Sequence, residues 1–180
     1  MIHEQWGYAS HDYEALDDIF KTFQPKSVLD VGCGSGRLFP FFLNHGVKDV
    51  IGIDISERAL TIAHERFPSV VVIKSDLEKL EFPQDRFDLV VCNRILQHIP
   101  FSSLQGTLGK LCKISRMIYV NELTINEDLP ENFYMARYDY AALFAMRGFR
   151  IQQSGLIGNQ CYRLFGRIHE SSPSEPVVSA

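Results

Sequence analysis

The chain has 180 residues and a formal net charge of −4, and 46% of its residues are hydrophobic. That length is enough for one domain with a full hydrophobic core. The 12 glycines and 8 prolines are spread along the chain, which excludes a collagen-like or largely disordered protein. The pI near 5.8 gives no basic field for a phosphate backbone, so nucleic acid is an unfavoured partner. We therefore expect a compact domain that binds a small molecule.

The cysteines and the first residues indicate in which cellular compartment the protein is expected. Cys33, Cys92, Cys112 and Cys161 stand apart with no CxxC pair, so we expect neither a metal site nor a disulfide framework. Residues 1–10 lack the basic start and apolar run of a secretory signal, and no stretch reaches the roughly 18 apolar residues of a membrane span. We expect a cytoplasmic protein with no membrane partner.

Hydrophobic periodicity predicts short apolar strands that alternate with helices. The first half of the chain reads as a helix at 13–23, a strand at 27–31, a helix at 37–44, a strand at 49–53 and a helix capped by Ser56. The second half reads as strands at 70–74 and 87–92, a helix marked by Leu104, Leu108 and Leu111, a strand at 117–120 and a helix ending at Gly148.

The strands at 70–74 and 87–92 are nearly continuously apolar, as strands covered on both faces tend to be. The stretches 149–153 and 161–168 are too close for a helical crossover, so they should form an antiparallel hairpin at the end of the sheet. The alternation predicts an open, doubly wound α/β sheet with its ligand site outside the carboxyl ends of the strands.

A glycine-rich loop follows the first predicted strand, in the run DVGCGSG of residues 30–36. Such a loop lets a ligand lie against the backbone, and we expect unpaired N–H groups of the helix start to be available to that ligand. The dinucleotide fingerprint G-x-G-x-x-G is not met, because Arg37 stands at its sixth position. Asp54 ends the second strand, where an acid can accept hydrogen bonds from ribose hydroxyls. The alternatives are that the glycines make only a tight turn and that Asp54 or Asp76 only caps a helix.

Four segments resemble, in order and context, the class I S-adenosylmethionine-dependent methyltransferases, in the small-molecule branch with the type 11/12 domain: VLDVGCGSG, IGIDIS, SDLEKLEF and FDLVVCNRILQHIP. The resemblance covers roughly residues 27–168. It implies S-adenosyl-L-methionine as cofactor, S-adenosyl-L-homocysteine as product, and a Rossmann-like sheet of seven strands in the order 3-2-1-4-5-7-6 with strand 7 antiparallel. We expect one domain over residues 1–168, with 1–25 as a helical segment over the cofactor site, and a disordered Ser- and Pro-rich tail at 169–180.

The resemblance also implies which residues hold the cofactor. The loop that approaches the methionine part would be Asp30, Gly32, Cys33, Gly34 and Gly36. Asp54 would bind the ribose hydroxyls, and Ile55 would pack on the adenine. The pair Asp76 and Leu77 would contact the amino group and ring edge of the adenine, and the carbonyl of Asn93 would meet the cofactor's amino group.

The acceptor side offers weaker candidates. An activated methyl group needs mainly positioning, but a hydroxyl acceptor also needs a base, for which His98 is placed just past the fourth strand. The alternative for His98 is a structural histidine near a helix start. Candidate substrate-binding residues are Trp6, Tyr8, Tyr13, Glu122, Tyr134 and Arg137. Aromatic faces could stabilise a cation, whereas Trp6 and Tyr13 could equally pack the first helix, and Glu122 could be a solvated strand-end acid.

We therefore expect a methyltransferase that acts on an oxygen or nitrogen of a small-molecule acceptor, alone, as a homodimer or with a partner subunit. The run Cys92-Asn93-Arg94-Ile95 is not the Asn/Asp-Pro-Pro-Tyr/Phe motif, which disfavours the amino groups of nucleobases or glutamine as targets. No paired glutamates that would hold an arginine guanidinium follow that strand. Two alternatives stay open: a cofactor-binding but inactive partner subunit, and a nucleotide-dependent oxidoreductase, against which Arg37 counts.

Overall fold

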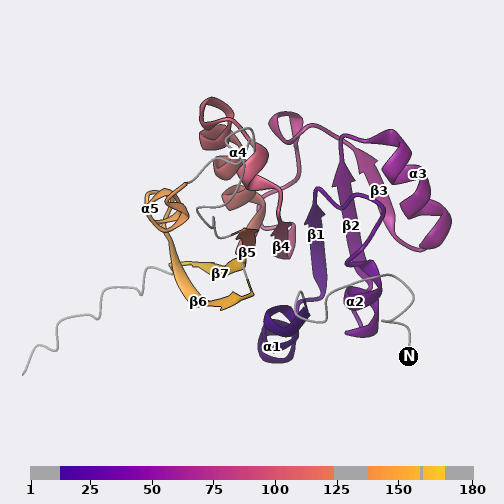
Figure 1. The fold of residues 1–180 in the computed structure, drawn as a ribbon, viewed down its shortest axis with the longest axis horizontal. Coiled ribbons are helices and arrows are strands. Elements are labelled where there is room, and N and C mark those ends of the chain that lie inside the picture. The colour runs from indigo at the N-terminus through magenta and orange to yellow at the C-terminus, as the bar shows by residue number, and fades with distance from the viewer. Residues whose placement is uncertain (1–12, 124–137, 159, 169–180) are drawn as a thin grey trace, which may run out of the picture.

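The structure is a computed structural model that describes residues 13–123, 138–158 and 160–168. Its centre is a sheet of seven strands in the order β3-β2-β1-β4-β5-β7-β6 (Figure 1). β7 runs antiparallel to its two neighbours, β5 and β6, whereas the pairs from β3 to β5 are parallel. The strand order and the antiparallel β7 confirm what the family resemblance implies, and the β6–β7 hairpin confirms the prediction from chain spacing.

The elements follow one another in the expected alternation. The strands are β1 (Ser27–Val31), β2 (Asp49–Asp54), β3 (Val71–Lys74), β4 (Phe87–Asn93), β5 (Ser115–Leu123), β6 (Phe149–Ile157) and β7 (Gln160–Arg167). The helices are α1 (Glu14–Phe23), α2 (Phe39–Asn44), α3 (Glu57–Arg66), α4 (Phe101–Ile114) and α5 (Tyr140–Ala145), with short 3-10 helices η3 (Leu77–Lys79) and η4 (Leu96–His98). α2 begins two residues later than predicted, since Pro40 lies in its first turn, where its missing N–H is tolerated.

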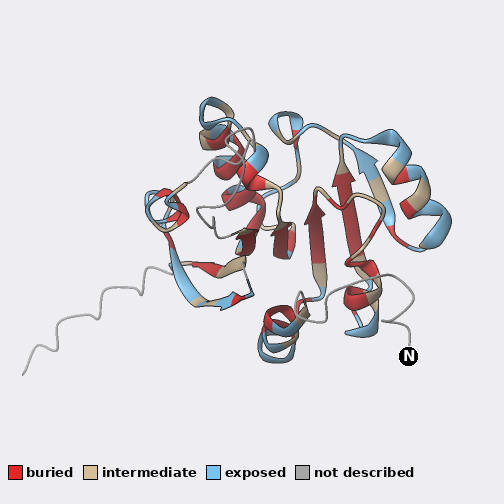
Figure 2. Cartoon of the chain, viewed as in Figure 1, coloured by how far each residue is buried: buried red, intermediate tan, exposed pale blue. Residues whose placement is uncertain are grey.

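The two faces of the sheet are covered by different helices. Because successive side chains of a strand point to opposite faces, Val28 and Leu89 pack in one core with α1, α2 and α3, while Leu29 and Val90 pack in a second core with α4 and α5. The central strands are buried on both faces, as their red colour in Figure 2 shows. Such double burial explains why β1 and β4 read as nearly continuous apolar runs.

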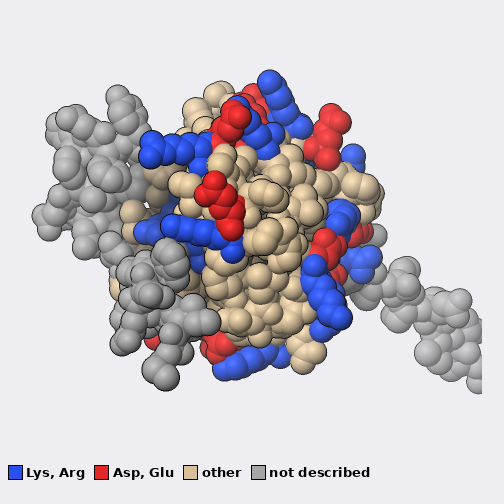
Figure 3. Space-filling view, turned by 90° about the vertical axis from the view of Figure 1, so that its right-hand side faces the viewer, with Lys and Arg blue, Asp and Glu red and all other residues tan. Residues whose placement is uncertain are grey.

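β3 departs from the expected burial. Its apolar composition predicted cover on both faces, yet Val71 is 56% exposed and Ile73 is 36% exposed. β3 pairs only with β2 and forms one edge of the sheet, so its position in the strand order decides its burial. Figure 3 looks onto this side of the molecule and shows basic and acidic side chains intermingled, with no field of a single sign.

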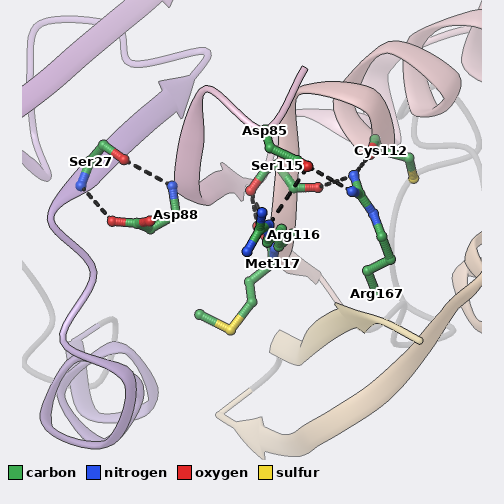
Figure 4. A network of polar contacts seen from close by, with 8 residues as sticks. All are labelled: Ser27, Asp85, Asp88, Cys112, Ser115, Arg116, Met117 and Arg167. Atoms are coloured by element: carbon green, nitrogen blue, oxygen red, sulfur yellow. Dashed lines mark hydrogen bonds and ion pairs between the residues drawn. The ribbon is translucent and has the colours of Figure 1, made fainter. Parts of the chain in front are cut away.

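A polar network ties the amino-terminal end of the sheet together (Figure 4). Arg167, at the end of β7, donates to Asp85 Oδ1 at 2.6 Å and to the carbonyl oxygen of Cys112 at 2.6 Å. The N–H of Ser27 donates to Asp88 Oδ2 at 3.1 Å, and the N–H of Asp88 donates to Ser27 Oγ at 2.9 Å. The network therefore links β7 to the end of α4 and β1 to β4, at the end of the sheet opposite the strand carboxyl ends.

Candidate functional site

A pocket of about 340 Å³ opens beyond the carboxyl ends of the parallel strands. Its walls come from the glycine loop after β1, the end of β2, the η3 turn, and the segment from η4 into α4. Both its position and its size are typical of a small-molecule site in an open α/β sheet. Six residues named from the sequence line it, namely Gly32, Asp54, Ile55, Asp76, Leu77 and His98.

Asp54 is held in place by backbone donors. The N–H of Gly34 donates to its Oδ2 at 2.9 Å, and the N–H of Ser56 donates to its Oδ1 at 2.8 Å. The N-cap of α3 is Ser56, whose Oγ accepts the N–H of Ala59 at 3.3 Å, so Asp54 does not serve as that cap. Each carboxylate oxygen can accept a second hydrogen bond. Because Asp54 lines the pocket, a bound ligand could donate that second bond.

The glycine loop is bonded to the protein itself. The N–H groups of Gly32 and Cys33 both donate to the carbonyl of Ile53, at 2.8 and 3.0 Å, and the N–H of Gly36 donates to the carbonyl of Cys33 at 3.0 Å. Together with the bond from Gly34 to Asp54, these contacts use four of the loop amides. These four loop amides are therefore not free for a ligand, and the helix start itself lies further along the chain, since α2 begins only at Phe39.

Gly32 of the glycine loop contacts the pocket wall that carries Ile95. Its φ is +68°, and a Cβ added there would lie 2.7 Å from Cδ1 of Ile95. A positive φ and a close approach each favour glycine at this position. The position of the turn that carries Ile95 is therefore tied directly to that of the loop.

Asp76 forms the entry to η3. Its Oδ1 accepts the N–H of Glu78 at 3.0 Å, which makes it the N-cap of this short helix, as the second interpretation of Asp76 foresaw. Asp76, Leu77 and Glu78 all line the pocket. Lys110 of α4 donates to the carbonyl of Glu78 and holds η3 against that helix. Capping and pocket lining are thus combined in one residue.

The electrostatics of the pocket are acidic. Its lining includes Asp54, Asp76 and Glu78 and no Lys or Arg among the described residues. Asp30 lies buried beneath the loop, and burial raises its pKa to about 7, with Asp54 adding to the rise and Arg37 opposing it. Carboxylates at this density favour ligands with hydroxyl, amino or cationic groups over anionic ligands.

The remaining residues implied for the cofactor do not line this pocket. They are Asp30, Cys33, Gly34, Gly36 and Asn93. Gly36 packs against α2, since a Cβ there would lie 2.6 Å from Cδ2 of Phe39. Asn93 Oδ1 accepts Nδ2 of Asn121 at 3.0 Å, across β4 and β5.

The acceptor-side candidates fall in different places. His98 is exposed, lines the pocket, and has its Nε2 3.3 Å from the side-chain nitrogen of Gln97. Tyr13 stacks on Phe41 with ring centroids 5.3 Å apart, on the α1 and α2 side. Trp6, Tyr8, Tyr134 and Arg137 lie outside the described residues, as do the predicted tail and the segment before Tyr13.

Glu122 is buried and is bound to the turn after β4. It is 6% exposed, and its Oε1 accepts the N–H of Leu96 at 2.9 Å. Its Oε2 has no partner among the described residues. Burial raises its pKa to about 8, against the opposing effect of the nearby N–H groups of Leu96, Gln97 and Ile95 and of the Arg94 charge.

Sequence reasoning missed several lining residues, among them Glu78, Ile95, Ile99, Ser103 and Thr107. Ser103 and Thr107 could have been found from the sequence, because residues four apart share one face of a helix and α4 begins directly after the turn that follows β4. No periodic signal marks Ile95 and Ile99, since their segment is a 3-10 turn.

The described part of the chain holds neither a cluster of metal-ligating side chains nor a membrane-spanning helix. Among these residues no group of three or more His, Cys, Asp or Glu side chains is placed to hold a metal ion. None of the helices in the same ranges has the length and apolar character needed to cross a membrane.

Comparison with known proteins agrees with the fold. Residues 28–116 match the family described as a methyltransferase domain. A protein arginine N-methyltransferase of Dictyostelium discoideum is 37% identical over 76 residues, which are 39% of this chain and 22% of that protein. A ubiquinone biosynthesis O-methyltransferase of Nitrosomonas europaea is 32% identical over 127 residues, which are 67% of this chain and 52% of that protein.

Solved structures share the architecture. The crystal structure of the Burkholderia thailandensis 1,6-didemethyltoxoflavin-N1-methyltransferase, with bound 1,6-didemethyltoxoflavin and S-adenosylhomocysteine, matches with a TM-score of 0.75 at 18% identity. The match covers 92% of this chain and 82% of that one. Fold, sheet order and family match together identify the domain of this chain as a class I S-adenosylmethionine-dependent methyltransferase domain. The matched part of the chain spans about half or less of the two curated relatives, whose acceptors differ in kind.

Proposed function

We propose that the pocket binds S-adenosyl-L-methionine and that the protein transfers its methyl group to an oxygen or nitrogen of a small-molecule acceptor. The observation that carries the proposal is Asp54, a carboxylate fixed by two backbone donors at the end of β2 and turned toward the pocket. Ile55 beside it is 71% exposed although it is apolar. A carboxylate beside an uncovered apolar surface suits a ribose joined to a flat base.

The same contacts argue against a dinucleotide. A pyrophosphate is held by free N–H groups at a helix start, whereas the amides of Gly32, Cys33, Gly34 and Gly36 already have acceptors inside the protein. The acidic lining would repel two phosphates and would favour a sulfonium cation. These points support the methyl donor over the oxidoreductase alternative.

The chemistry that the bound cofactor supplies is a methyl group activated by a positive sulfur. The protein's own part is to place the acceptor atom in line and to keep water away, which can supply most of the rate. The acceptor oxygen or nitrogen forms the new bond to carbon as the sulfur–carbon bond breaks, and the acceptor loses a proton. His98, on the pocket wall, is our candidate to take that proton from a hydroxyl acceptor.

The test is calorimetric titration of the purified chain with S-adenosylhomocysteine and, in parallel, with NAD. We expect S-adenosylhomocysteine to bind and NAD not to bind. Asp54→Ala should weaken binding at least about tenfold, because hydrogen bonds to a charged group are worth roughly 1.5–3 kcal/mol. Asp49→Ala, at the other end of β2 and paired with Arg86, is the matched control and should bind normally.

Each outcome decides something. Binding of NAD in place of S-adenosylhomocysteine would favour the oxidoreductase, and binding of neither would contradict the assigned pocket. Asp54-dependent binding without turnover of any acceptor, alone or with candidate partner proteins, would favour the inactive-subunit alternative. Turnover that His98→Ala abolishes only for hydroxyl acceptors would support the role of His98 as a base.

A further inference from the structure

The turn after β4 forms one wall of the pocket without being part of the sheet. Arg94 begins it with a φ of +59°, and its N–H donates to the carbonyl of Asn121 at 2.7 Å. The chain then makes the single 3-10 turn of η4, closed by the N–H of His98 donating to the carbonyl of Ile95 at 3.1 Å. A turn of this length has few hydrogen bonds of its own, so its position depends on contacts with other elements.

Those contacts come from the end of β5 and from Tyr138. Glu122 Oε1 accepts the N–H of Leu96 at 2.9 Å. Gln97 Oε1 accepts the N–H of Leu123 at 3.2 Å. The hydroxyl of Tyr138 donates to the carbonyl of Ile99 at 2.6 Å. Of the three side chains that make these bonds, Glu122 is the only acid, and it sits on the rigid sheet.

The carboxyl group of Glu122 acts on the middle of the turn. The N–H of Leu96 donates to its Oε1 at 2.9 Å, and the nearby N–H groups of Leu96, Gln97 and Ile95 oppose the rise that burial gives to the pKa of Glu122. This hydrogen bond ties the turn to the end of β5 through a carboxyl oxygen, which can accept it whether or not the carboxyl group is protonated. The geometry is specific for a side chain of this length, because the carboxyl group has to reach from β5 to Leu96.

The fixed turn places two pocket-lining side chains. Ile95 packs against Gly32 so closely that a Cβ added there would force the Ile95 side chain to shift, and His98 lines the pocket from the same turn. Glu122 itself does not line the pocket. Its influence on a ligand therefore has to pass through the turn.

We propose that Glu122 is a positioning residue for the ligand pocket, because its carboxyl group fixes the turn at residues 95–98 and with it the wall formed by Ile95 and His98. The inference rests on the proposed function, since it takes the ligand of that wall to be the methyl-donor cofactor. It adds a residue outside the pocket to those that determine cofactor affinity.

The experiment measures the affinity for S-adenosylhomocysteine by calorimetry in the wild type and in a set of Glu122 variants. Glu122→Ala removes the anchor, and we expect the dissociation constant to rise about tenfold or more. Glu122→Asp keeps the carboxyl group but withdraws it by one methylene, and should also weaken binding. Glu122→Gln keeps an acceptor oxygen at the same reach and should restore affinity to within about threefold of the wild type.

The control separates positioning from loss of stability. Leu111→Ala empties part of the core under the last turn of α4, where Leu111 is fully buried, at the end of that helix away from the turn at residues 95–98. It should lower the melting temperature yet leave the dissociation constant unchanged. If Glu122→Ala does not fold, Glu122→Asp and Glu122→Gln carry the comparison.

Two results would overturn the proposal. One is unchanged affinity in Glu122→Ala or in Glu122→Asp, and the other is a Glu122→Gln protein that binds as weakly as Glu122→Ala. Both differ from failure of the proposed function, in which the wild type itself would not bind S-adenosylhomocysteine.

Discussion

Gly32 and Gly34 stand two residues apart in one loop, and both have positive φ angles, of +68° and +54°. They differ in what a side chain would meet. A Cβ at Gly32 would lie 2.7 Å from Ile95, whereas a Cβ at Gly34 would have nothing within 4 Å. Backbone strain and steric conflict can therefore be separated by two alanine variants of the same loop.

Gly34→Ala should cost only the left-handed backbone strain, roughly 1–2 kcal/mol of unfolding free energy, with a modest effect on ligand affinity. Gly32→Ala should add the conflict with Ile95 and displace the pocket wall, so that affinity for S-adenosylhomocysteine falls below the detection limit of calorimetry. Urea unfolding and calorimetry on both variants make the test. Equal affinities in the two variants would show that the contact with Ile95 is irrelevant to binding.

Single residues also show why part of the site was visible in the sequence. Asp54 ends β2, Ile55 follows it, and the pair Asp76 and Leu77 comes just after β3. Parallel strands bring such positions to one edge of the sheet. Glu122 occupies an equivalent position at the end of β5, yet it is buried. Its burial depends on the β4 turn that packs over it, which is a contact between segments that periodicity does not encode.

At the scale of elements, the sequence predicted most accurately what lies in the centre of the sheet. β1 has the predicted bounds, since an apolar run between Pro25 and a glycine loop leaves little freedom. β3 was misjudged because an edge strand and a central strand can have the same composition. The start of α2 was misplaced because turn residues and the first helical turn have similar propensities.

The network at the amino-terminal end of the sheet gives a prediction about how elements are joined. Arg167 and Arg116 both reach Asp85, but Arg167 is 2.6 Å from it and mostly buried, whereas Arg116 is 3.6 Å away and 63% exposed (Figure 4). Arg167 also donates to the carbonyls of Cys112 and Ser115, where α4 ends and β5 begins. One arginine thus joins three elements, and the other makes a surface ion pair.

Arg167→Met should lower the unfolding free energy by about 2 kcal/mol, because it leaves half-buried carbonyls and a carboxylate with fewer donors. Arg116→Met is the matched control, and it should cost less than about 1 kcal/mol, as exposed ion pairs do. Urea unfolding measures both. Both variants should bind S-adenosylhomocysteine normally, since the network lies at the end of the sheet away from the pocket. A larger loss in Arg116→Met would contradict this assignment.

In the whole molecule, the polar network that stabilises the sheet and the pocket lie at opposite ends of the strands. Arg167 and Asp85 fix the amino-terminal end, and the carboxyl end holds the pocket with the buried acids Asp30 and Glu122. Buried acids are costly when ionised. The functional end should therefore make the stability of the whole molecule depend on pH.

The sign of that dependence follows from the raised pKa values. Burial raises the pKa of Glu122 from 4.5 to about 8, and that of Asp30 from 3.8 to about 7. At a pH between its unfolded and its folded pKa, each acid has released its proton in the unfolded chain but still binds it in the folded protein. Their stabilising contribution is complete below the unfolded pKa and is lost as the pH rises through the folded value.

Glu122→Gln isolates one of the two acids because glutamine stays neutral. Its unfolding free energy should be close to that of the wild type near pH 5 and should exceed it increasingly up to about pH 8, by at most about 1.4 kcal/mol per pH unit. Urea unfolding at several pH values between 5 and 9 gives the difference curve. Glu57→Gln is the control, because Lys74 lowers the pKa of this exposed acid and its contribution stays constant over that range. A flat difference curve for Glu122→Gln would mean that Glu122 is already ionised in the folded protein near pH 5. The nearby backbone N–H groups would then lower its pKa by more than burial raises it.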